Sequence, residues 1–269
     1  GKIDLLIVGD WMPITFLAND GKKFTDVTTA YSPPKLNGWW YFINVADINN
    51  DGNPDFILGN YGTNSKLQAT SEFPLRMYLA DFDGNGNPDQ LLCVNKNGTY
   101  YPFLGKEELE KQLPFMKKKF LEYGSVAGKS VNEIFDKNTL DNAKIFEAYN
   151  LQSGVLLNNG QGKFSWAAVP PAAQVAPVFS ILQVDLNNDG KKSLLGGGNF
   201  YGVLPYEGRY DASNLWLLQF NKNNWQTIIP GSSAFYLHGE VRDIKIVRSI
   251  HGSKYIAVAR NNASIRFYK

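Results

Sequence analysis

Short apolar runs alternate along this chain with clusters of Asp, Asn and Gly, and one arrangement of the two recurs. Residues 45–58, 79–92 and 184–195 each place an acidic loop that contains glycine between two apolar runs. Apolar runs of this length, bounded by turn-forming residues, are typical of β-strands. The pattern therefore predicts a strand, an acidic loop and a second strand in each segment.

Two further segments carry part of the same pattern. Residues 1–8 fit the second half of the unit, with Asp4 at the place of Asp55 and Asp89, so we expect the chain to begin within a loop. Residues 241–259 keep the strand pair but have no acidic loop between the strands. This last unit is therefore expected to bind no metal ion.

Asn, Asp and Gly also separate apolar runs at residues 17–24, 157–164 and 220–225. Tight hairpins need these residue types because their central positions have positive φ. Together, the acidic loops and the hairpins predict four-stranded antiparallel units, which are the blades of a β-propeller. We expect an all-β fold in which residues 1–269 form a single β-propeller domain or a fragment of one, an incomplete ring of about four to five blade equivalents.

Residues 104–150 interrupt this rhythm. Apolar side chains recur there at spacings of three and four residues in the segments 107–113, 117–122 and 140–148. This spacing is typical of amphipathic helices. The sequence thus predicts a small helical insertion within one blade, with the basic run 117–119 on a solvated helix face.

Composition narrows the classes of function. The 27 basic and 25 acidic residues give a net charge of +2, too small and too scattered for a nucleic-acid partner. No apolar stretch of about 18 residues is present, so we expect no transmembrane segment in this chain. The single cysteine, Cys93, cannot form an internal disulfide and lies in an apolar run, which indicates a buried side chain.

The first acidic loop has the residue types of a calcium site. Its oxygen-bearing side chains stand at positions one, three, five and nine, which are Asp47, Asn49, Asp51 and Asp55. Alternate side chains of a tightly curled loop point inward, so their oxygen atoms converge, and Gly52 at position six permits the sharp turn. Asn53 at position seven is expected to contribute its backbone carbonyl. Oxygen ligands without His or Cys favour Ca²⁺ over zinc or copper.

The second loop repeats this pattern, and the third keeps part of it. The expected ligands of the second loop are Asp81, Asp83, Asn85, Asp89 and the carbonyl of Asn87. Those of the third are Asp185, Asn187 and Asp189. Because Ser193 replaces the final Asp there, we expect two Ca²⁺ sites and a third that is weaker or empty.

These loops also share features with two other structures, an EF-hand and an ordinary turn. An EF-hand needs a bidentate Glu at position twelve, where these loops have Leu58, Leu92 and Gly196, and it needs flanking helices. Alternatively, the loops are ordinary turns rich in Asn and Asp. Such turns would bring three carboxylates together without a cation to offset their repulsion.

These loops resemble a known family. The pattern Asp-x-Asn-x-Asp-Gly-x-x-Asp between two strands resembles the FG-GAP and VCBS repeats of integrin-like β-propellers. The wider chain is similar to bacterial relatives of cartilage acidic protein, the ASPIC/UnbV group, at residues 111–120, 208–213 and 239–244. The resemblance implies propellers of about seven blades, with calcium at the rim and roles in adhesion or ligand capture at the cell surface. It also implies a longer polypeptide, with blades missing on the N-terminal side.

A ligand-binding face is predicted at the opposite end of the strand pairs. Similar loops follow the second strand of each unit, so they are expected to share one surface. Flat aromatic and charged side chains are common anchors of recognition surfaces. The candidates are Trp11, Tyr61, Tyr201, Tyr206, Arg209 and Tyr210. The alternative is that these aromatic rings pack between blades, the role also assigned to Trp39, Trp40 and Trp166.

The sequence favours a binding protein over an enzyme. It contains two histidines and none of the common nucleophile, nucleotide or zinc motifs. We expect a calcium-binding scaffold that recognises an extracellular glycan or protein. Calcium loops of this class fill at the concentrations found outside the cytoplasm, so the expected location is the periplasm, the cell surface or the medium.

Two alternative functions stay open at this point. One is a polysaccharide lyase or glycosidase that uses carboxylates on the propeller face, for which Glu207, Asp211 and Glu240 are the candidates. The other is a purely structural spacer.

Overall fold

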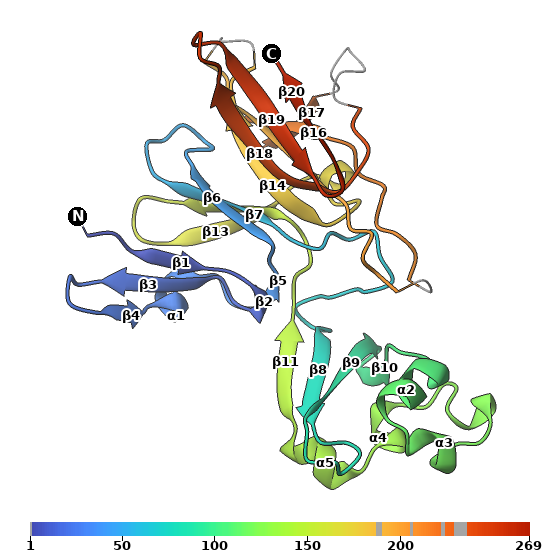
Figure 1. Ribbon diagram of the computed structural model, residues 1–269. Coiled ribbons are helices and arrows are strands. Elements are labelled where there is room, and N and C mark those ends of the chain that lie inside the picture. Colours follow the sequence, from blue (N-terminus) through green and yellow to red (C-terminus); the bar gives the residue numbers. More distant parts are fainter. Residues whose placement is uncertain (1, 187–189, 205–206, 222–223, 229–235) are drawn as a thin grey trace. The chain divides into compact units, whose positions relative to one another are not determined.

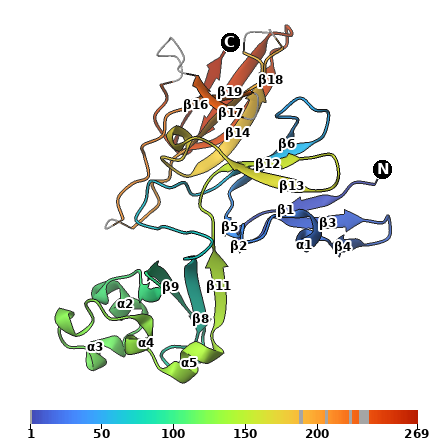
Figure 2. The ribbon, with the colours of Figure 1, turned by 180° about the vertical axis from the view of Figure 1, so that it is seen from behind.

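The computed structural model describes residues 2–186, 190–204, 207–221, 224–228 and 236–269. The chain forms two compact units, residues 1–66 together with 151–269, and residues 67–150. Both units consist mainly of antiparallel β-sheet with short helices (Figures 1 and 2). Among the described residues, no helix is both long enough and apolar enough to span a lipid bilayer.

The larger unit begins with a three-stranded sheet. Its strand order is β1–β3–β4, with β1 at Leu5–Ile7, β3 at Thr15–Asn19 and β4 at Phe24–Asp26. The short helix α1 (Thr28–Tyr31) follows β4, and β2 (Asp10–Met12) pairs with β5 (Gly38–Trp39).

Three further sheets complete the larger unit. The second has the order β13–β12–β7–β6, formed by β6 (Phe42–Ala46), β7 (Asp55–Gly59), β12 (Gly154–Asn158) and β13 (Phe164–Ala168). The third has the order β14–β15–β16–β17, formed by β14 (Val178–Val184), β15 (Ser193–Gly198), β16 (Trp216–Asn221) and β17 (Asn224–Ile228), and the 3₁₀ helix η2 (Pro171–Ala173) precedes it. The fourth has the order β18–β19–β20, formed by β18 (Val241–Arg248), β19 (Lys254–Arg260) and β20 (Ala263–Tyr268).

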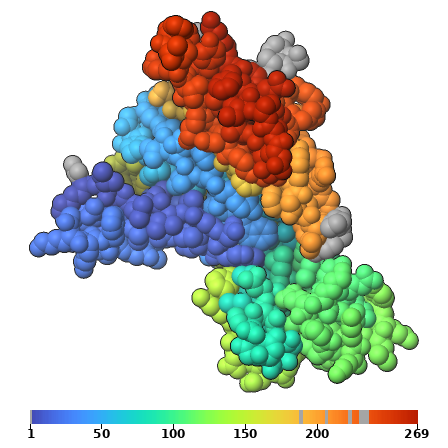
Figure 3. Space-filling model, in the orientation of Figure 1, coloured from blue at the N-terminus to red at the C-terminus, as the bar shows by residue number. Residues whose placement is uncertain are grey.

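Apolar side chains fill the space between successive sheets of this unit. One cluster joins the first sheet to the second and includes Phe16 and Leu58. A second cluster joins the second sheet to the third through Ile57 and Ile181, and a third cluster packs Leu195 of the third sheet with residues of the fourth. In the space-filling view, the surface of the first sheet adjoins that of β6 and β7 (Figure 3). The unit is therefore a series of sheets with apolar layers between them.

A buried polar network joins the residues that follow β7 to the residues that precede β12 and to Gln174. The Asn60 amide donates to Ser153 Oγ at 2.9 Å, and the Gly62 amide donates to the Leu151 carbonyl at 2.7 Å. Gln174 accepts from the Ser153 amide at 2.9 Å and donates to the Ser153 carbonyl at 2.8 Å. Because Asn60, Ser153 and Gln174 are buried, these bonds satisfy groups that water cannot reach.

The smaller unit lies between β7 and β12 in the sequence. Its sheet has the order β10–β9–β8–β11, formed by β8 (Leu75–Ala80), β9 (Asp89–Lys96), β10 (Thr99–Pro102) and β11 (Lys144–Ala148). Its helices are α2 (Lys106–Gln112), α3 (Met116–Lys119), η1 (Tyr123–Ser125), α4 (Val131–Ile134) and α5 (Lys137–Asn142). Leu109, Leu113 and Met116 from the helical segment pack in one core with Leu91 and Cys93 of β9.

Cys93 has the buried position that the sequence predicts. Its side chain is fully buried in this core, and burial raises the pKa of the thiol to about 12. The thiol therefore stays protonated and unreactive in the folded protein at neutral pH.

Four-stranded antiparallel sheets are confirmed in both units, and the hairpins predicted at 17–24 and 157–164 join β3 to β4 and β12 to β13. The hairpin predicted at 220–225 joins β16 to β17, although residues 222–223 lie outside the described part. The described elements do not form a closed propeller ring. The first and last sheets of the larger unit have three strands each.

The helical segment differs from the prediction in one respect. Residues 144–148 were predicted as the end of a helix, but they form β11, because pairing along β8 provides hydrogen bonds that the helical spacing does not reveal. The helices α2 to α5 lie within the predicted insertion at 104–150, and the compact unit that contains them extends over residues 67–150. The second acidic loop belongs to this unit, since β8 and β9 pair within its own sheet.

Candidate metal sites and aromatic surface

The second acidic loop connects β8 to β9 and is organised by the carboxylate at its first position. Asp81 Oδ1 accepts hydrogen bonds from the amides of Gly84 at 2.7 Å and Asn85 at 3.0 Å. Asp81 Oδ2 accepts from the Gly86 amide at 2.8 Å. Gly84 and Gly86 have φ of 75° and 86°, which glycine adopts without strain. The sequence thus curls the loop around Asp81.

This curl brings three carboxylates together. Oxygen atoms of Asp81, Asp83 and Asp89 all lie within 4.8 Å of one another. Burial raises the pKa of Asp89, and the negative charges of Asp83 and Asp81 raise it further. The hydrogen bond from the Gly86 amide is the main cause that lowers the pKa of Asp81. The group is therefore rich in negative charge that a cation would offset.

The donor set fits a hard divalent cation. Asp81, Asp83 and Asp89 offer carboxylate oxygens, the ligands that Ca²⁺ prefers in proteins. Asn85 and Asn87 belong to the same loop, and Asn85 Oδ1 accepts from the Asn87 amide at 2.7 Å. These five residues are the ligands that the sequence predicts for the second site.

The first acidic loop, between β6 and β7, repeats the same hydrogen bonds. Asp47 Oδ2 accepts from the Gly52 amide at 3.1 Å, as Asp81 does from Gly86. At the ninth position, Asp55 Oδ2 accepts from the Ile48 amide at 2.9 Å, and Asp89 Oδ2 accepts from the Phe82 amide at 3.0 Å. The two loops have one local fold although they lie in different units.

The loops differ in where their acidic side chains stand. The first loop has Asn49 at the third position, and the Asn49 side-chain amide donates to Asp51 Oδ2 at 2.9 Å. Asp51 Oδ1 accepts from the Asn53 amide at 2.8 Å, the main cause that lowers the pKa of Asp51. Among the described residues, the second loop is where three acidic groups gather closely enough to hold an ion. The Ca²⁺ site of the first loop stays a prediction.

The opening residues of the chain reproduce the end of this loop. Asp4 Oδ1 accepts from the Asn19 amide at 2.8 Å, and Asp55 Oδ1 accepts from the Asn158 amide at 2.7 Å. The Asn19 side chain donates to the Ile3 carbonyl at 2.8 Å, as the Asn158 side chain does to Pro54 at 3.2 Å. Asp4 is therefore the structural counterpart of Asp55, as the sequence pattern predicts.

Residues 1–58 match the family model of an FG-GAP-like repeat. The matched segment extends from the first sheet through the first acidic loop into β7. A search of curated proteins gave no match for the chain. The hydrogen bonds described above show that the local fold of this FG-GAP-like repeat recurs in the loop at 81–89, outside the matched residues.

The third loop retains the first part of this local fold. Asp185 Oδ2 accepts from the Gly190 amide at 2.9 Å, which repeats the bond between positions one and six. Asn187 and Asp189, the other predicted ligands, lie outside the described residues. Ser193 is buried at the ninth position, where the other two loops have Asp55 and Asp89.

The predicted ligand face contains a row of contacting aromatic rings. Trp11 meets Trp39 edge to face at 5.2 Å between ring centroids, Trp39 meets Tyr61 at 4.9 Å, and Tyr61 meets Tyr210 at 5.1 Å. Only 7% of Tyr61 and 8% of Tyr210 is exposed. Burial raises the pKa of both phenols, which are hydrogen-bonded to each other. These two rings stabilise the fold and offer little area to a ligand.

The remaining candidates are more accessible. Trp11 and Tyr201 are partly exposed, Arg209 is exposed, and the Arg209 guanidinium lies 5.3 Å from the centroid of the Tyr201 ring. Tyr206 lies outside the described residues. Trp40 is buried and meets Trp166 edge to face at 5.5 Å, consistent with the packing role predicted for both.

The carboxylates considered for catalysis have different surroundings. Glu240 is buried, and its Oε1 accepts from the Tyr201 amide at 2.9 Å and from Arg242 at 2.6 Å. Burial alone would raise the pKa of Glu240, but these bonds and one from Asn261 lower it below its usual value. Glu207 accepts from the Tyr210 hydroxyl at 3.3 Å. Asp211 is exposed.

Proposed function

We propose that this protein is a calcium-binding recognition scaffold that works outside the cytoplasm. The cluster of Asp81, Asp83 and Asp89 carries this proposal, because it gathers hard oxygen ligands in a loop whose hydrogen bonds recur at 47–55. Ca²⁺ bound there would fix β8 to β9. Loops of this class bind Ca²⁺ at the concentrations found outside the cytoplasm, so we place the protein in the periplasm, on the cell surface or in the medium.

Calcium is expected to stabilise the folded protein through this cluster. At about 100 times its dissociation constant, Ca²⁺ should raise the free energy of unfolding by about 2.7 kcal/mol, provided that the unfolded chain does not bind it. Asp83→Asn removes one charged ligand and should abolish the part of the stabilisation that arises in this loop. Thermal unfolding with and without Ca²⁺, together with isothermal titration calorimetry, measures both effects.

Asp141→Asn is the matched control for this experiment. Asp141 is exposed on α5 of the same unit, where it pairs with Lys137 at 2.5 Å, and it lies in none of the three acidic loops. Its replacement removes one negative charge and should leave calcium binding unchanged. Wild-type protein that takes up no Ca²⁺, or Asp83→Asn protein that binds as many ions as the control, would count against the calcium proposal.

For recognition, we propose that the partly exposed Trp11 and Tyr201, with Arg209, contact a glycan or a protein. Support comes from the backbone of Trp11, which has a φ of 62°. Bulky residues rarely adopt such values, and strained residues are common at binding sites. In this proposal the protein is a binding module and not an enzyme. The surroundings of Glu240 support that choice, because its buried carboxylate is already held by the Tyr201 amide, Arg242 and Asn261.

Substitutions in this face should separate recognition from stability. Tyr201→Ala and Arg209→Ala are expected to weaken ligand binding by roughly tenfold or more, because aromatic and arginine anchors dominate such interfaces. Their melting temperatures should stay close to that of the wild type. Tyr61→Ala should lower the melting temperature, since Tyr61 is buried between Trp39 and Tyr210. Glycan and protein arrays read binding, and retained binding by both exposed-site variants would contradict this assignment.

A further inference from the structure

Residues of β9, β10, α2, η1 and α4 line a cavity of about 540 Å³ in the smaller unit. That volume is common for sites that bind small molecules. Apolar side chains form much of the wall, among them Phe103, Leu104, Val126 and Ile134. Of the described residues that line the cavity, three are charged, and all of them are lysines: Lys96, Lys106 and Lys129.

Lys106 is a charged group that water hardly reaches. Only 10% of its side chain is exposed, and its ammonium group pairs with Glu110, whose side chain is 12% exposed. The ammonium nitrogen lies 5.5 Å from the centroid of the Tyr123 ring, which also belongs to the wall. The bond to Glu110 uses one of the three N–H donors of the ammonium group. Lys106 can therefore donate to a further acceptor inside the cavity.

The other two lysines of the wall have no acidic partner among the described residues. Lys129 is half-buried and Lys96 is exposed, and neither forms an ion pair there. The Lys96 ammonium nitrogen lies 5.8 Å from the centroid of the Tyr101 ring, which lines the same cavity. Two positive charges of the wall are thus left without a paired carboxylate.

The acidic side chains of this region are engaged elsewhere. Glu107 accepts from the Tyr123 hydroxyl, and Glu133 accepts from the Ser130 amide at 2.8 Å and the Ser130 hydroxyl at 2.7 Å. These bonds from Ser130 are the main cause that lowers the pKa of Glu133, and the charge of Lys129 adds a smaller part. Neither glutamate lines the cavity. The wall therefore carries an excess of positive charge.

This wall suits an organic anion with an apolar body. Ammonium groups attract a carboxylate, and the attraction strengthens where water is partly excluded. A sugar would find few hydrogen-bond partners among the apolar side chains, and a metal ion would meet lysines in place of oxygen ligands. We propose that this cavity binds a small aromatic carboxylate, with its charged group held by the lysines of the wall and its ring against Tyr123 and Phe103.

Phenylacetate and its neutral analogue phenylacetamide test this proposal with the wild-type chain. The two have nearly the same shape and differ in charge, so a cavity lined by lysines should bind phenylacetate tighter by roughly tenfold or more. Titration at neutral pH, followed by NMR or calorimetry, measures the two affinities. Excess EDTA is present throughout, which keeps the result independent of the calcium proposal. Equal affinities, or no binding of phenylacetate, would overturn the assignment.

Two variants locate the site in the smaller unit. The double variant Lys96→Gln and Lys129→Gln removes two charges that are in no ion pair, so phenylacetate should bind roughly tenfold more weakly and phenylacetamide should be unaffected. Tyr123→Ala removes an exposed ring and should weaken binding of both ligands. The matched control is Lys117→Gln with Lys118→Gln, because both lysines are exposed on α3 and lie outside the wall. The control should bind both ligands as the wild type does.

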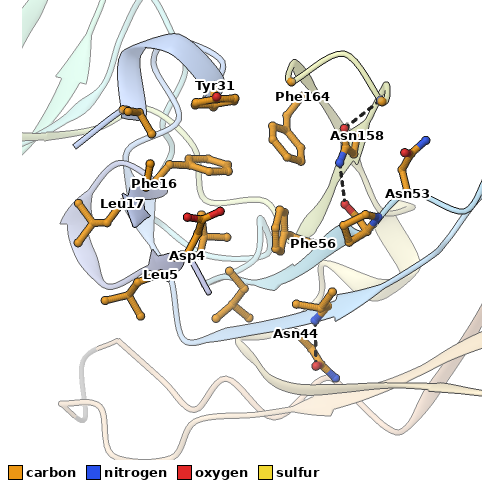
Figure 4. A pocket seen from close by; sticks show the side chains of 18 residues that line it. Asp4, Leu5, Phe16, Leu17, Tyr31, Asn44, Asn53, Phe56, Asn158 and Phe164 are labelled. Atoms are coloured by element: carbon orange, nitrogen blue, oxygen red, sulfur yellow. Dashed lines mark hydrogen bonds between the residues drawn. The ribbon is translucent and has the colours of Figure 1, made fainter. Parts of the chain in front are cut away.

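These variants are needed because the larger unit also has a cavity that an aromatic ligand could enter. That cavity, of about 600 Å³, opens between the first and second sheets, and its wall contains the rings of Phe16, Phe56 and Phe164 (Figure 4). Its charged residue is the acidic Asp4, which would not favour phenylacetate over phenylacetamide. Unaltered phenylacetate binding by the folded lysine double variant refutes the proposal. If that variant fails to fold, NMR shifts of the wild type decide, since phenylacetate should shift residues 96–134 and not the larger unit.

Discussion

Asp55→Ala is expected to lower the free energy of unfolding by about 2–6 kcal/mol, because it leaves two backbone amides without partners at roughly 1–3 kcal/mol each. The Asp55 side chain is fully buried. Its two oxygens accept from Ile48 in the first acidic loop and from Asn158 at the end of β12. One carboxylate thus joins segments that stand 103 residues apart in the sequence. Urea unfolding in EDTA measures the loss without a contribution from calcium.

Asp51→Ala is the control within the same loop. Asp51 has the same charge, but its side chain is exposed and its partners are residues of the loop itself. We expect a much smaller loss of stability, since water can replace these bonds. Similar losses for the two variants would show that the charge of the loop, and not the buried link to β12, determines its contribution to stability.

Gly198→Ala is the second substitution with a large expected effect. A Cβ atom at position 198 would lie 1.6 Å from the carbonyl oxygen of Pro177, which belongs to the backbone and cannot rotate away. Val178, next in the chain, pairs with Gly198 across β14 and β15, so relief requires these strands to separate. Overpacking of this kind typically lowers the free energy of unfolding by about 1–3 kcal/mol, and occasionally by more. We expect a large drop in the unfolding midpoint, or insoluble protein.

Gly124→Ala provides the comparison for this clash. No atom lies within 4 Å of the Cβ that would be added at Gly124. This variant should unfold at nearly the same urea concentration as the wild type, because an added methyl group meets no neighbour. A Gly198→Ala protein as stable as Gly124→Ala would mean that β14 and β15 do not approach as closely as the structure indicates.

Much of the local structure follows from the sequence alone. The strands around the acidic loops were predicted because apolar runs and Asp–Gly turns are local signals, and β6, β7, β8 and β9 form where expected. The positions of Asp81 and Asp89 in the second loop follow from the same pattern. Even the equivalence of Asp4 and Asp55 could be read from spacing. A curled loop is determined by residues that lie within about ten positions of one another.

Other features depend on residues far apart in the chain. β11 exists because Lys144–Ala148 meets the edge of β8, a pairing that no local signal encodes. Tyr61 and Tyr210 were predicted to face a ligand, and the structure buries them against each other across some 150 positions. Sequence spacing places a ring on a loop, but only packing decides whether that ring is covered.

The sequence by itself determined the repeated strand, acidic loop and strand units and their oxygen-rich residues. The tertiary structure decided that residues 67–150 form a compact unit of their own. It also decided that Asp55 accepts a hydrogen bond from the distant Asn158 amide and that Asp4 lines a cavity between two sheets. The physical reason is the range of the interactions. Turn geometry depends on neighbouring residues, whereas burial and strand pairing depend on distant segments that the folded chain brings together.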